Sequence, residues 1–264
     1  MKAIFKGFIL VGVFLGALFL MQQVDWRTIF HLKKVQDKTE EKVGEMVWEI
    51  VSQTEEEVVD TAILAMVDTV FREICLANGI ESSSIRLHVI KNDQVNAFAI
   101  PGNHIIIYSG LIASAKNESE FAGVLSHELA HLQKNHVMKK LIKEVGFSVL
   151  VDMTAGGGGV IVKKVAQVLS SSAYDRSLEE EADLQAVEYL GTAGYDARQF
   201  GEFMYRLSDE DSSDSSMMVW ISTHPDSKDR AEYIIKSASK KGKSNLNYSA
   251  EQWESLSTQA SNLN

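Results

Sequence analysis

The sequence has little cysteine, little proline and a deficit of basic residues. One cysteine among 264 residues excludes an intramolecular disulfide framework and a zinc ribbon built from several cysteines. Two prolines and 17 glycines exclude a collagenous or proline-rich chain. The 26 basic residues are outnumbered by 36 acidic ones, which gives a net charge of −10. Because a phosphate backbone repels an acidic surface, we expect no nucleic acid as the main partner.

The chain begins with a short apolar segment. Lys2 and Lys6 precede an uncharged stretch over residues 7–24, whose apolar part is intermediate in length between a signal-peptide core and a membrane-spanning helix. No convincing cleavage site follows it. We therefore interpret residues 1–24 as an uncleaved membrane anchor, with a cleaved signal as the alternative. The preceding lysines favour an N-terminus on the inner side, although basic residues also follow the segment closely.

The rest of the chain has a mainly helical hydrophobic pattern, and its composition, 45% hydrophobic and 23% charged, is that of a folded protein. Residues 25–57 form a charged helical linker in this interpretation, residues 58–238 a folded domain and residues 239–264 a polar C-terminal tail. Helices are expected over residues 58–78, 118–145, 161–172, 176–193, 196–207 and 226–238. Short strands are expected over residues 85–90, 95–100 and 104–108. The pattern predicts an α+β fold, mainly α-helical, with one small sheet.

The segment that carries the chemistry has the form H-E-x-x-H, at His127, Glu128 and His131. Residues i and i+4 lie on one face of a helix, so both histidines can direct a ring nitrogen at one metal ion. Glu128 sits beside that face and can reach a metal-held water without binding the metal. Asn117, followed three residues later by Glu120, marks the start of this helix.

A catalytic zinc ion needs a third protein ligand, and an acidic run supplies candidates. Glu179 and Asp183 are again spaced i, i+4, so Glu179 can bind the metal while Asp183 orients a ligand histidine through its other N–H. Taken alone, the run is better explained as an acidic helix start favoured by the helix dipole. Glu180 and Glu181 are interpreted in that way, as solvated charges.

His224, followed by proline, is a weaker third motif. Near an open zinc site, His224 can donate a hydrogen bond to the oxyanion of a tetrahedral intermediate, or close over the metal in a resting form. Arg176 and Arg230 are candidates to balance the nearby carboxylates, although lone arginines more often form ordinary surface pairs.

The ordered set of motifs resembles peptidase family M48, which contains the HtpX-type membrane proteases, the CAAX prenyl proteases and smaller envelope metallopeptidases. The matching segments are residues 96–105, the H-E-x-x-H motif, residues 176–183, and His224 with Arg230. The resemblance implies a zincin-like metallopeptidase fold over residues 58–238, with the sheet beside the H-E-x-x-H helix. It also implies that Glu179 is the third ligand of one catalytic zinc ion.

This resemblance implies a zinc-dependent endopeptidase that hydrolyses unfolded or misassembled envelope proteins, with a zinc-bound water activated by Glu128. The strand residues Ala97, Phe98 and Ala99 are expected to offer an edge to an extended peptide, or else to be ordinary sheet core. We expect a membrane-anchored envelope protein with a periplasmic peptidase domain, or a secreted one if the anchor is cleaved. The alternative is a membrane-tethered, zinc-binding chaperone-like or assembly factor without proteolysis, in which Glu128→Gln would leave function intact.

Overall fold

The computed structural model describes residues 26–156, 159–208, 218–225, 227–238 and 246–263. The chain divides into two compact units, residues 1–39 and residues 40–264. Helix α2 (Trp26–Thr54) begins in the first unit and ends in the second. All the described strands, and all the residues with a predicted role in chemistry, belong to the second unit.

A three-stranded sheet supports the candidate site. Its strands are β1 (Arg86–Ile90), β2 (Ala97–Ile100) and β3 (His104–Tyr108), in the spatial order β1-β3-β2. β1 runs parallel to β3, and β2 runs antiparallel to β3, with Ile100 opposite His104. β2 is therefore an edge strand of this sheet. The three predicted strands are confirmed, although β1 and β2 begin slightly later than expected.

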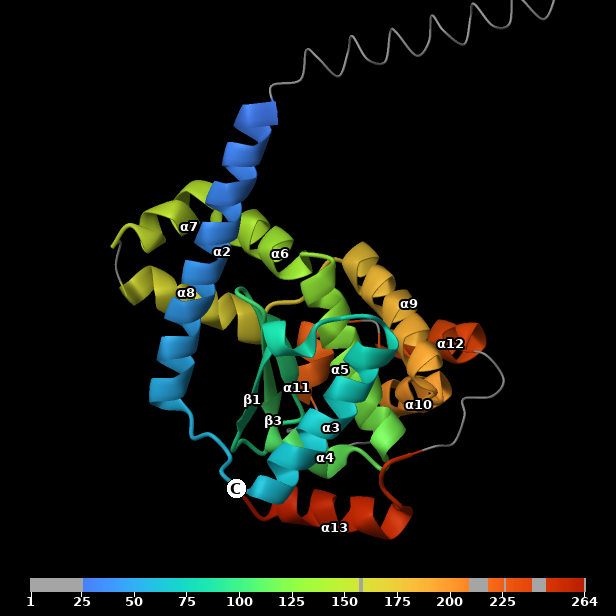
Figure 1. Cartoon of the computed structure of the whole chain (residues 1–264). Coiled ribbons are helices and arrows are strands. Elements are labelled where there is room, and N and C mark those ends of the chain that lie inside the picture. The colour runs from blue at the N-terminus through green and yellow to red at the C-terminus, as the bar shows by residue number, and fades with distance from the viewer. Residues whose placement is uncertain (1–25, 157–158, 209–217, 226, 239–245, 264) are drawn as a thin grey trace, which may run out of the picture. The chain divides into compact units, whose positions relative to one another are not determined.

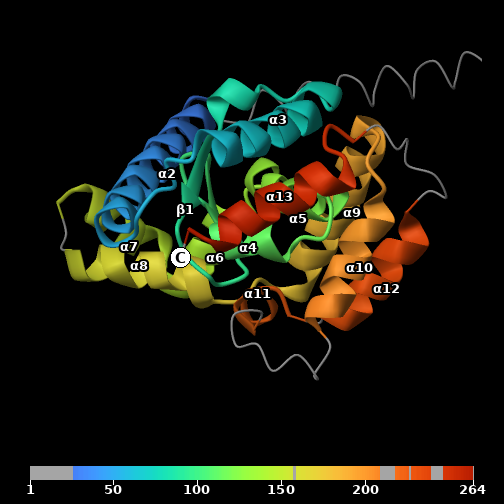
Figure 2. The ribbon, with the colours of Figure 1, turned by 90° about the horizontal axis from the view of Figure 1, so that it is seen from below.

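Helices make up most of the remaining described chain, so the predicted α+β, mainly helical fold is confirmed. Figure 1 and Figure 2 show α9, α10 and α12 grouped together, and α6, α7 and α8 grouped together elsewhere. The helices after α2 are α3 (Thr61–Ala77), α4 (Ser109–Ser114), α5 (Glu118–Gln133), α6 (His136–Val145), α7 (Phe147–Thr154), α8 (Gly159–Ser171), α9 (Arg176–Ala193), α10 (Ala197–Leu207), α11 (Met218–Thr223), α12 (Ser227–Ser237) and α13 (Ala250–Ser261), with a short 3-10 helix at Ser82–Ser84.

Helix α5 carries the H-E-x-x-H motif and lies within the core. Its predicted start is confirmed, because the Asn117 side chain accepts a hydrogen bond from Glu120 N–H. Every residue from Glu118 to Leu132 is buried, since α5 packs against α3, α9, α10 and strand β2. A helix enclosed on all sides can hold polar groups only where they pair with one another, which is what the site residues do.

The predicted continuous helix over residues 118–145 is wrong. Helix α5 ends at Gln133, and a second helix, α6, begins at His136. Asn135 separates them in the left-handed conformation, with φ of 56°. Asparagine adopts this conformation more readily than most residues, so the break has a local cause that hydrophobic periodicity does not reveal.

The predicted polar tail over residues 239–264 contains helix α13. Tyr248 N–H bonds to the Glu118 carboxylate at 3.0 Å, and Trp253 Nε1 donates to the carbonyl of Ala115 at 2.7 Å. The first contact holds the C-terminal segment against the start of α5, and the second holds it against the end of α4. The described part of this segment therefore packs mainly on α4 and α3, and it also contacts the first turn of α5.

The anchor predicted over residues 1–24 lies outside the described residues. Within the described part of the chain, no helix combines the length and the apolar character that crossing a membrane requires.

Candidate metal centre

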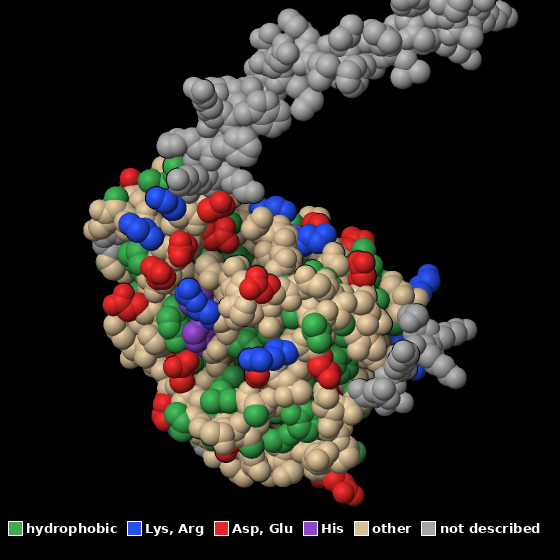
Figure 3. Space-filling model, in the orientation of Figure 1, with side chains coloured by type: hydrophobic (Ala, Val, Ile, Leu, Met, Phe, Trp, Pro, Cys, Tyr) green, Lys and Arg blue, Asp and Glu red, His purple; other side chains and the backbone are tan. Residues whose placement is uncertain are grey.

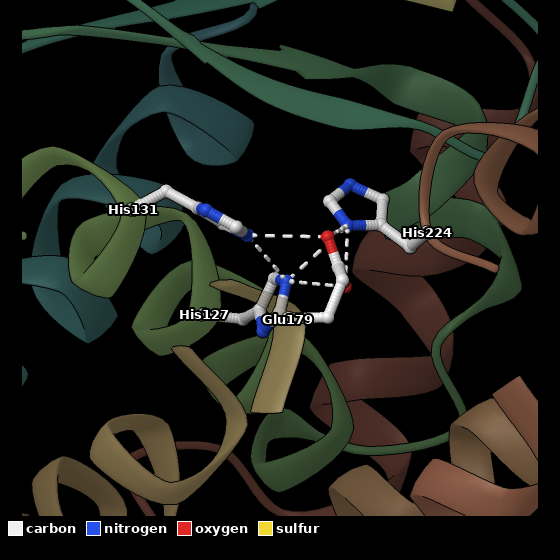
Figure 4. Close-up of side chains that lie close together, drawn as sticks. All are labelled: His127, His131, Glu179 and His224. Carbon is white, nitrogen blue, oxygen red and sulfur yellow. Dashed lines mark hydrogen bonds and ion pairs between the residues drawn. The ribbon is translucent and has the colours of Figure 1, made fainter. Parts of the chain in front are cut away.

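Four buried side chains from three parts of the chain converge on one point. His127 and His131 come from α5, Glu179 from the first turn of α9, and His224 from the residue after α11 (Figure 4). The i, i+4 spacing on α5 presents both of its histidine rings to the same side. Each of the four residues offers one ligand atom, and these atoms all lie within 4.8 Å of one another.

The separations between these atoms fit a tetrahedral metal ion. His127 Nε2 lies 2.9 Å from His131 Nε2 and 3.2 Å from His224 Nδ1. The Glu179 carboxylate lies 3.0 Å from His224 Nδ1 and 3.6 Å from His131 Nε2. Ligands about 2.1 Å from a zinc ion at tetrahedral angles are about 3.4 Å apart. Imidazole and carboxylate groups are also ligands that zinc accepts, so these residues fit a zinc ion.

A buried carboxylate supports His127 from the side opposite the cluster. Asp183, one turn after Glu179 on α9, places Oδ1 3.0 Å from His127 Nδ1. Arg230 of α12 holds the same carboxylate through Nε and Nη2, each at 2.7 Å. Its Nη1 contacts Glu179, and the hydroxyl of Tyr233 donates to Asp183. Asp183 and Arg230 thus form one buried network with two of the candidate ligands.

Burial and neighbouring charges set the protonation of the cluster. Burial lowers the pKa of His131 to about 3 and the pKa of His224 to about 4, so both rings are neutral near pH 7. Burial alone would raise the pKa of Glu179, but His224 and Arg230 hold that pKa well below its usual range. Arg230 similarly outweighs burial at Asp183 and lowers the pKa of that carboxyl to about 2. Neutral imidazoles and ionised carboxylates are the forms that bind metals.

Glu128 lies at the edge of the cluster. Its Oε2 accepts a hydrogen bond from Ala99 N–H of β2 at 3.0 Å, and its Oε1 lies 3.5 Å from His224 Nε2. Burial, reinforced by the negative charge of Glu179, raises the pKa of Glu128 well above its usual value. A carboxyl group with a raised pKa beside a metal position can take up a proton and release it again.

Sequence reasoning missed three rings that contact the candidate ligands. Tyr174, just before α9, stacks on His131 with ring centroids 4.0 Å apart. Trp220 of α11 stacks on His224 at the same centroid separation. His136, the first residue of α6, approaches His131. No spacing rule links these positions to the motif, so the sequence offered no signal for them.

The remaining predicted site residues lie in contrasting surroundings. Arg176 is exposed at the first position of α9, whereas the candidate ligands are buried. Ala97, Phe98 and Ala99 are buried in β2, and Ala99 is the one that contacts Glu128.

The cluster is shielded from solvent in this conformation. Its four candidate ligands have exposed fractions of 1% or less. On the face shown in Figure 3, histidine appears only as a small spot among acidic and basic side chains. Exclusion of water strengthens the electrostatic interactions among the buried groups.

Two histidines one helical turn apart, a carboxylate from a second helix and a buried glutamate beside them are an arrangement typical of metal-dependent peptidases. The sequence profile of peptidase family M48 matches residues 64–238, and the chain belongs to this family. The family predicted from the motifs, and with it the class of metallopeptidases, is therefore confirmed.

Proteins similar in sequence to this chain support the same class, the metallopeptidases. The beta-barrel assembly-enhancing protease of Yersinia pestis is 28% identical over 170 residues, which cover 58% of this chain and 34% of that protein. The mitochondrial metalloendopeptidase OMA1 of Schizosaccharomyces pombe is 26% identical over 171 residues, covering 64% of this chain and 51% of that protein. The OMA1 metalloendopeptidase of Bos taurus is 28% identical over 171 residues, which cover 59% of this chain and 33% of that protein. The match thus spans about a third to a half of the length of these relatives.

Proposed function

We propose that this chain is a zinc-dependent endopeptidase. The observation that carries the proposal is the buried cluster of His127, His131, Glu179 and His224 with Glu128 at its edge. A zinc ion held by the first three of these residues would polarise a water molecule and lower its pKa towards about 7. His224 occupies the fourth side of the cluster in this conformation, so it withdraws when water and substrate enter. It is then placed to donate a hydrogen bond to the oxyanion.

Glu128 performs the proton transfers in this proposal. It takes a proton from the attacking water and passes it to the leaving amine, a role that needs a carboxylate within reach of both. The hydrogen bond from Ala99 fixes Oε2 and leaves Oε1 on the side of the cluster. Asp183 accepts the Nδ1 proton of His127 and so keeps the Nε2 lone pair available for the metal.

The edge of β2 that does not pair with β3 is the proposed binding site for the peptide backbone. Tyr108 N–H bonds to the Asn96 carbonyl, and paired residues alternate along an antiparallel ladder. Phe98 therefore bonds to β3, while Ala97 and Ala99 direct their main-chain groups away from β3, where the N–H of Ala99 is already bonded to Glu128. Both residues are buried in this conformation, so we propose that this edge is uncovered when substrate enters. An extended substrate can then pair with the main-chain groups of Ala97 and with the Ala99 carbonyl, with little dependence on its side chains. This edge also adjoins Glu128, which brings a bound peptide close to the proton-transfer group.

We infer that the substrates are unfolded or misassembled envelope polypeptides. Main-chain pairing requires an extended segment, which folded proteins seldom expose. The name of the Yersinia pestis relative, beta-barrel assembly-enhancing protease, connects that protein with the assembly of β-barrel proteins. We further propose that residues 1–24 anchor the chain in the membrane and place the peptidase domain outside the cytoplasm. Resistance of the chain to a carbonate wash of membranes tests the anchor.

The function is tested by removing and restoring the metal. The full chain is stripped with 1,10-phenanthroline, dialysed, and assayed with or without added zinc on two forms of one substrate, native lysozyme and reduced, carboxymethylated lysozyme. We expect cleavage of the unfolded form alone, loss of cleavage after stripping, and recovery with zinc. Failure of the zinc-loaded chain to cleave the unfolded form would contradict the proposal. Suppression of lysozyme aggregation without cleavage would instead favour a chaperone-like factor.

A further inference from the structure

His131 is supported by a chain of two hydrogen bonds that leads away from the cluster. His136 Nδ1 lies 3.1 Å from His131 Nδ1, and His136 Nε2 lies 3.2 Å from Glu181 Oε2. The ring of His136 is fully buried, whereas the Glu181 side chain is 45% exposed. Lys134 Nζ lies 3.3 Å from the other oxygen of Glu181. Glu181 is therefore exposed, as expected for a solvated charge, but it also pairs with His136 and Lys134, which the sequence did not predict.

Only one arrangement of protons satisfies both contacts of His136 with neutral rings. An ionised carboxylate accepts hydrogen bonds and cannot donate them, so the proton of His136 must lie on Nε2, facing Glu181. The Nδ1 lone pair of His136 then faces His131 and requires a donor there. His131 consequently carries its proton on Nδ1. Its Nε2 lone pair is left facing the cluster, as a metal ligand requires.

The break between α5 and α6 makes this contact possible. In a continuous helix, residue 136 would lie about 140° around the axis from residue 131 and would face another side. The left-handed Asn135 redirects the chain, and His136 then approaches the back of the His131 ring. The contact between His136 and His131 thus depends on the left-handed backbone conformation of Asn135.

The two histidines of the motif are supported in different ways. His127 meets a carboxylate directly, through Asp183. At its distal nitrogen, Nδ1, His131 meets a second imidazole, and the Glu181 carboxylate contacts that imidazole rather than His131. A ligand histidine normally needs an acceptor on its distal nitrogen to fix its tautomer and the orientation of its ring.

We propose that His136, held by Glu181, is a positioning residue that fixes the tautomer and ring orientation of the metal ligand His131. This inference rests on the proposed zinc site and adds two residues to it. His136 contacts neither the metal position nor Glu128 in the described structure, so its effect passes through His131.

Substitutions at His136 separate this role from simple packing. In His136→Asn, Oδ1 branches from the same carbon as Nδ1 of histidine and keeps an acceptor for His131. His136→Leu fills space without an acceptor, and His136→Gln places its polar atoms near the former Nε2 instead. For the carboxylate, Glu181→Met removes the acceptor, and Glu180→Met is the matched control on an exposed neighbour in the same helix.

Zinc affinity is the main readout, measured in the full chain by competition with a chromophoric chelator. We expect His136→Leu and His136→Gln to weaken zinc binding about 10- to 100-fold, the usual effect of losing such a support. His136→Asn should retain affinity within about fivefold of wild type, and Glu181→Met should lose more than Glu180→Met. Thermal unfolding of the metal-free variants checks that each is folded.

A second readout needs no metal. In ¹⁵N-histidine NMR of the metal-free chain, the His136 ring, identified by its loss in His136→Asn, should carry its proton on Nε2. A proton on Nδ1 would overturn the proposal, as would wild-type zinc affinity in folded His136→Leu. If either of these results is obtained while the wild type binds zinc and cleaves unfolded lysozyme, the inference about His136 fails and the proposed function stands. If the wild type binds no zinc, the proposed function fails with it.

Discussion

Replacing Asp183 with asparagine should damage both the fold and the metal site. Its two oxygens receive two N–H groups of Arg230 at 2.7 Å, the hydroxyl of Tyr233, and the approach of His127 Nδ1 at 3.0 Å. Asparagine offers one acceptor oxygen, and its amide group would face donors. Breaking a buried ion pair costs about 3–5 kcal/mol, and Glu179 still contacts Arg230, so we expect about 3 kcal/mol. The loss of the support of His127 should also weaken zinc binding about 10- to 100-fold.

Urea unfolding of the metal-free chain measures the first effect, and chelator competition measures the second. Asp229→Asn is the matched control, because Asp229 is an exposed aspartate on α12, the helix that carries Arg230. The reasoning is refuted if Asp183→Asn unfolds within about 0.5 kcal/mol of the control and binds zinc as tightly, since a buried network of this kind cannot lose a carboxylate without cost.

Substitutions at three further positions test the fold around the site. Asn135→Ala should lower the free energy of unfolding by about 1 kcal/mol and Asn135→Gly should not, because Asn135 has φ of 56°; equal urea midpoints for the two would contradict this. Gly123→Ala should cost about 1–3 kcal/mol, since its Cβ would lie 2.4 Å from Phe200 Cβ; an unchanged midpoint would show that α5 and α10 can separate freely. Burial lowers the pKa of His104 from 6.5 to about 4. Between pH 6.5 and about pH 4, His104 therefore takes up a proton in the unfolded chain but not in the folded chain. The free energy of unfolding consequently falls as the pH drops through this range. His104→Gln should therefore lose about 2 kcal/mol less than wild type between pH 7.5 and pH 5; an equal loss would assign the pH dependence to other groups.

The sequence predicts the parts of the site that depend on one regular helix. His127, Glu128 and His131 follow from i, i+4 spacing, which survives in the structure because α5 is regular over that stretch. Glu179 and Asp183 follow the same rule on α9, but their meeting with α5 is a tertiary contact that spacing cannot supply. Resemblance to a family provided that link.

The contacts that the sequence missed depend on irregular backbone. His136 reaches His131 only because Asn135 turns the chain, and a hydrophobic pattern does not report the sign of φ. Tyr174 reaches the same ring from a segment outside any helix. The described part of the predicted C-terminal tail was missed for another reason, since α13 buries few residues and its pattern is mostly polar.

Comparison of Glu128→Gln with wild type at matched zinc content tests the central claim most directly. Glutamine keeps the size of Glu128 and can still accept the hydrogen bond from Ala99, but it cannot take up a proton at pH 7. The account predicts about one zinc per chain in both proteins and a rate of casein cleavage at least about 100-fold lower in the variant. Equal cleavage by the two zinc-loaded proteins would contradict the assignment of Glu128 as the proton-transfer residue.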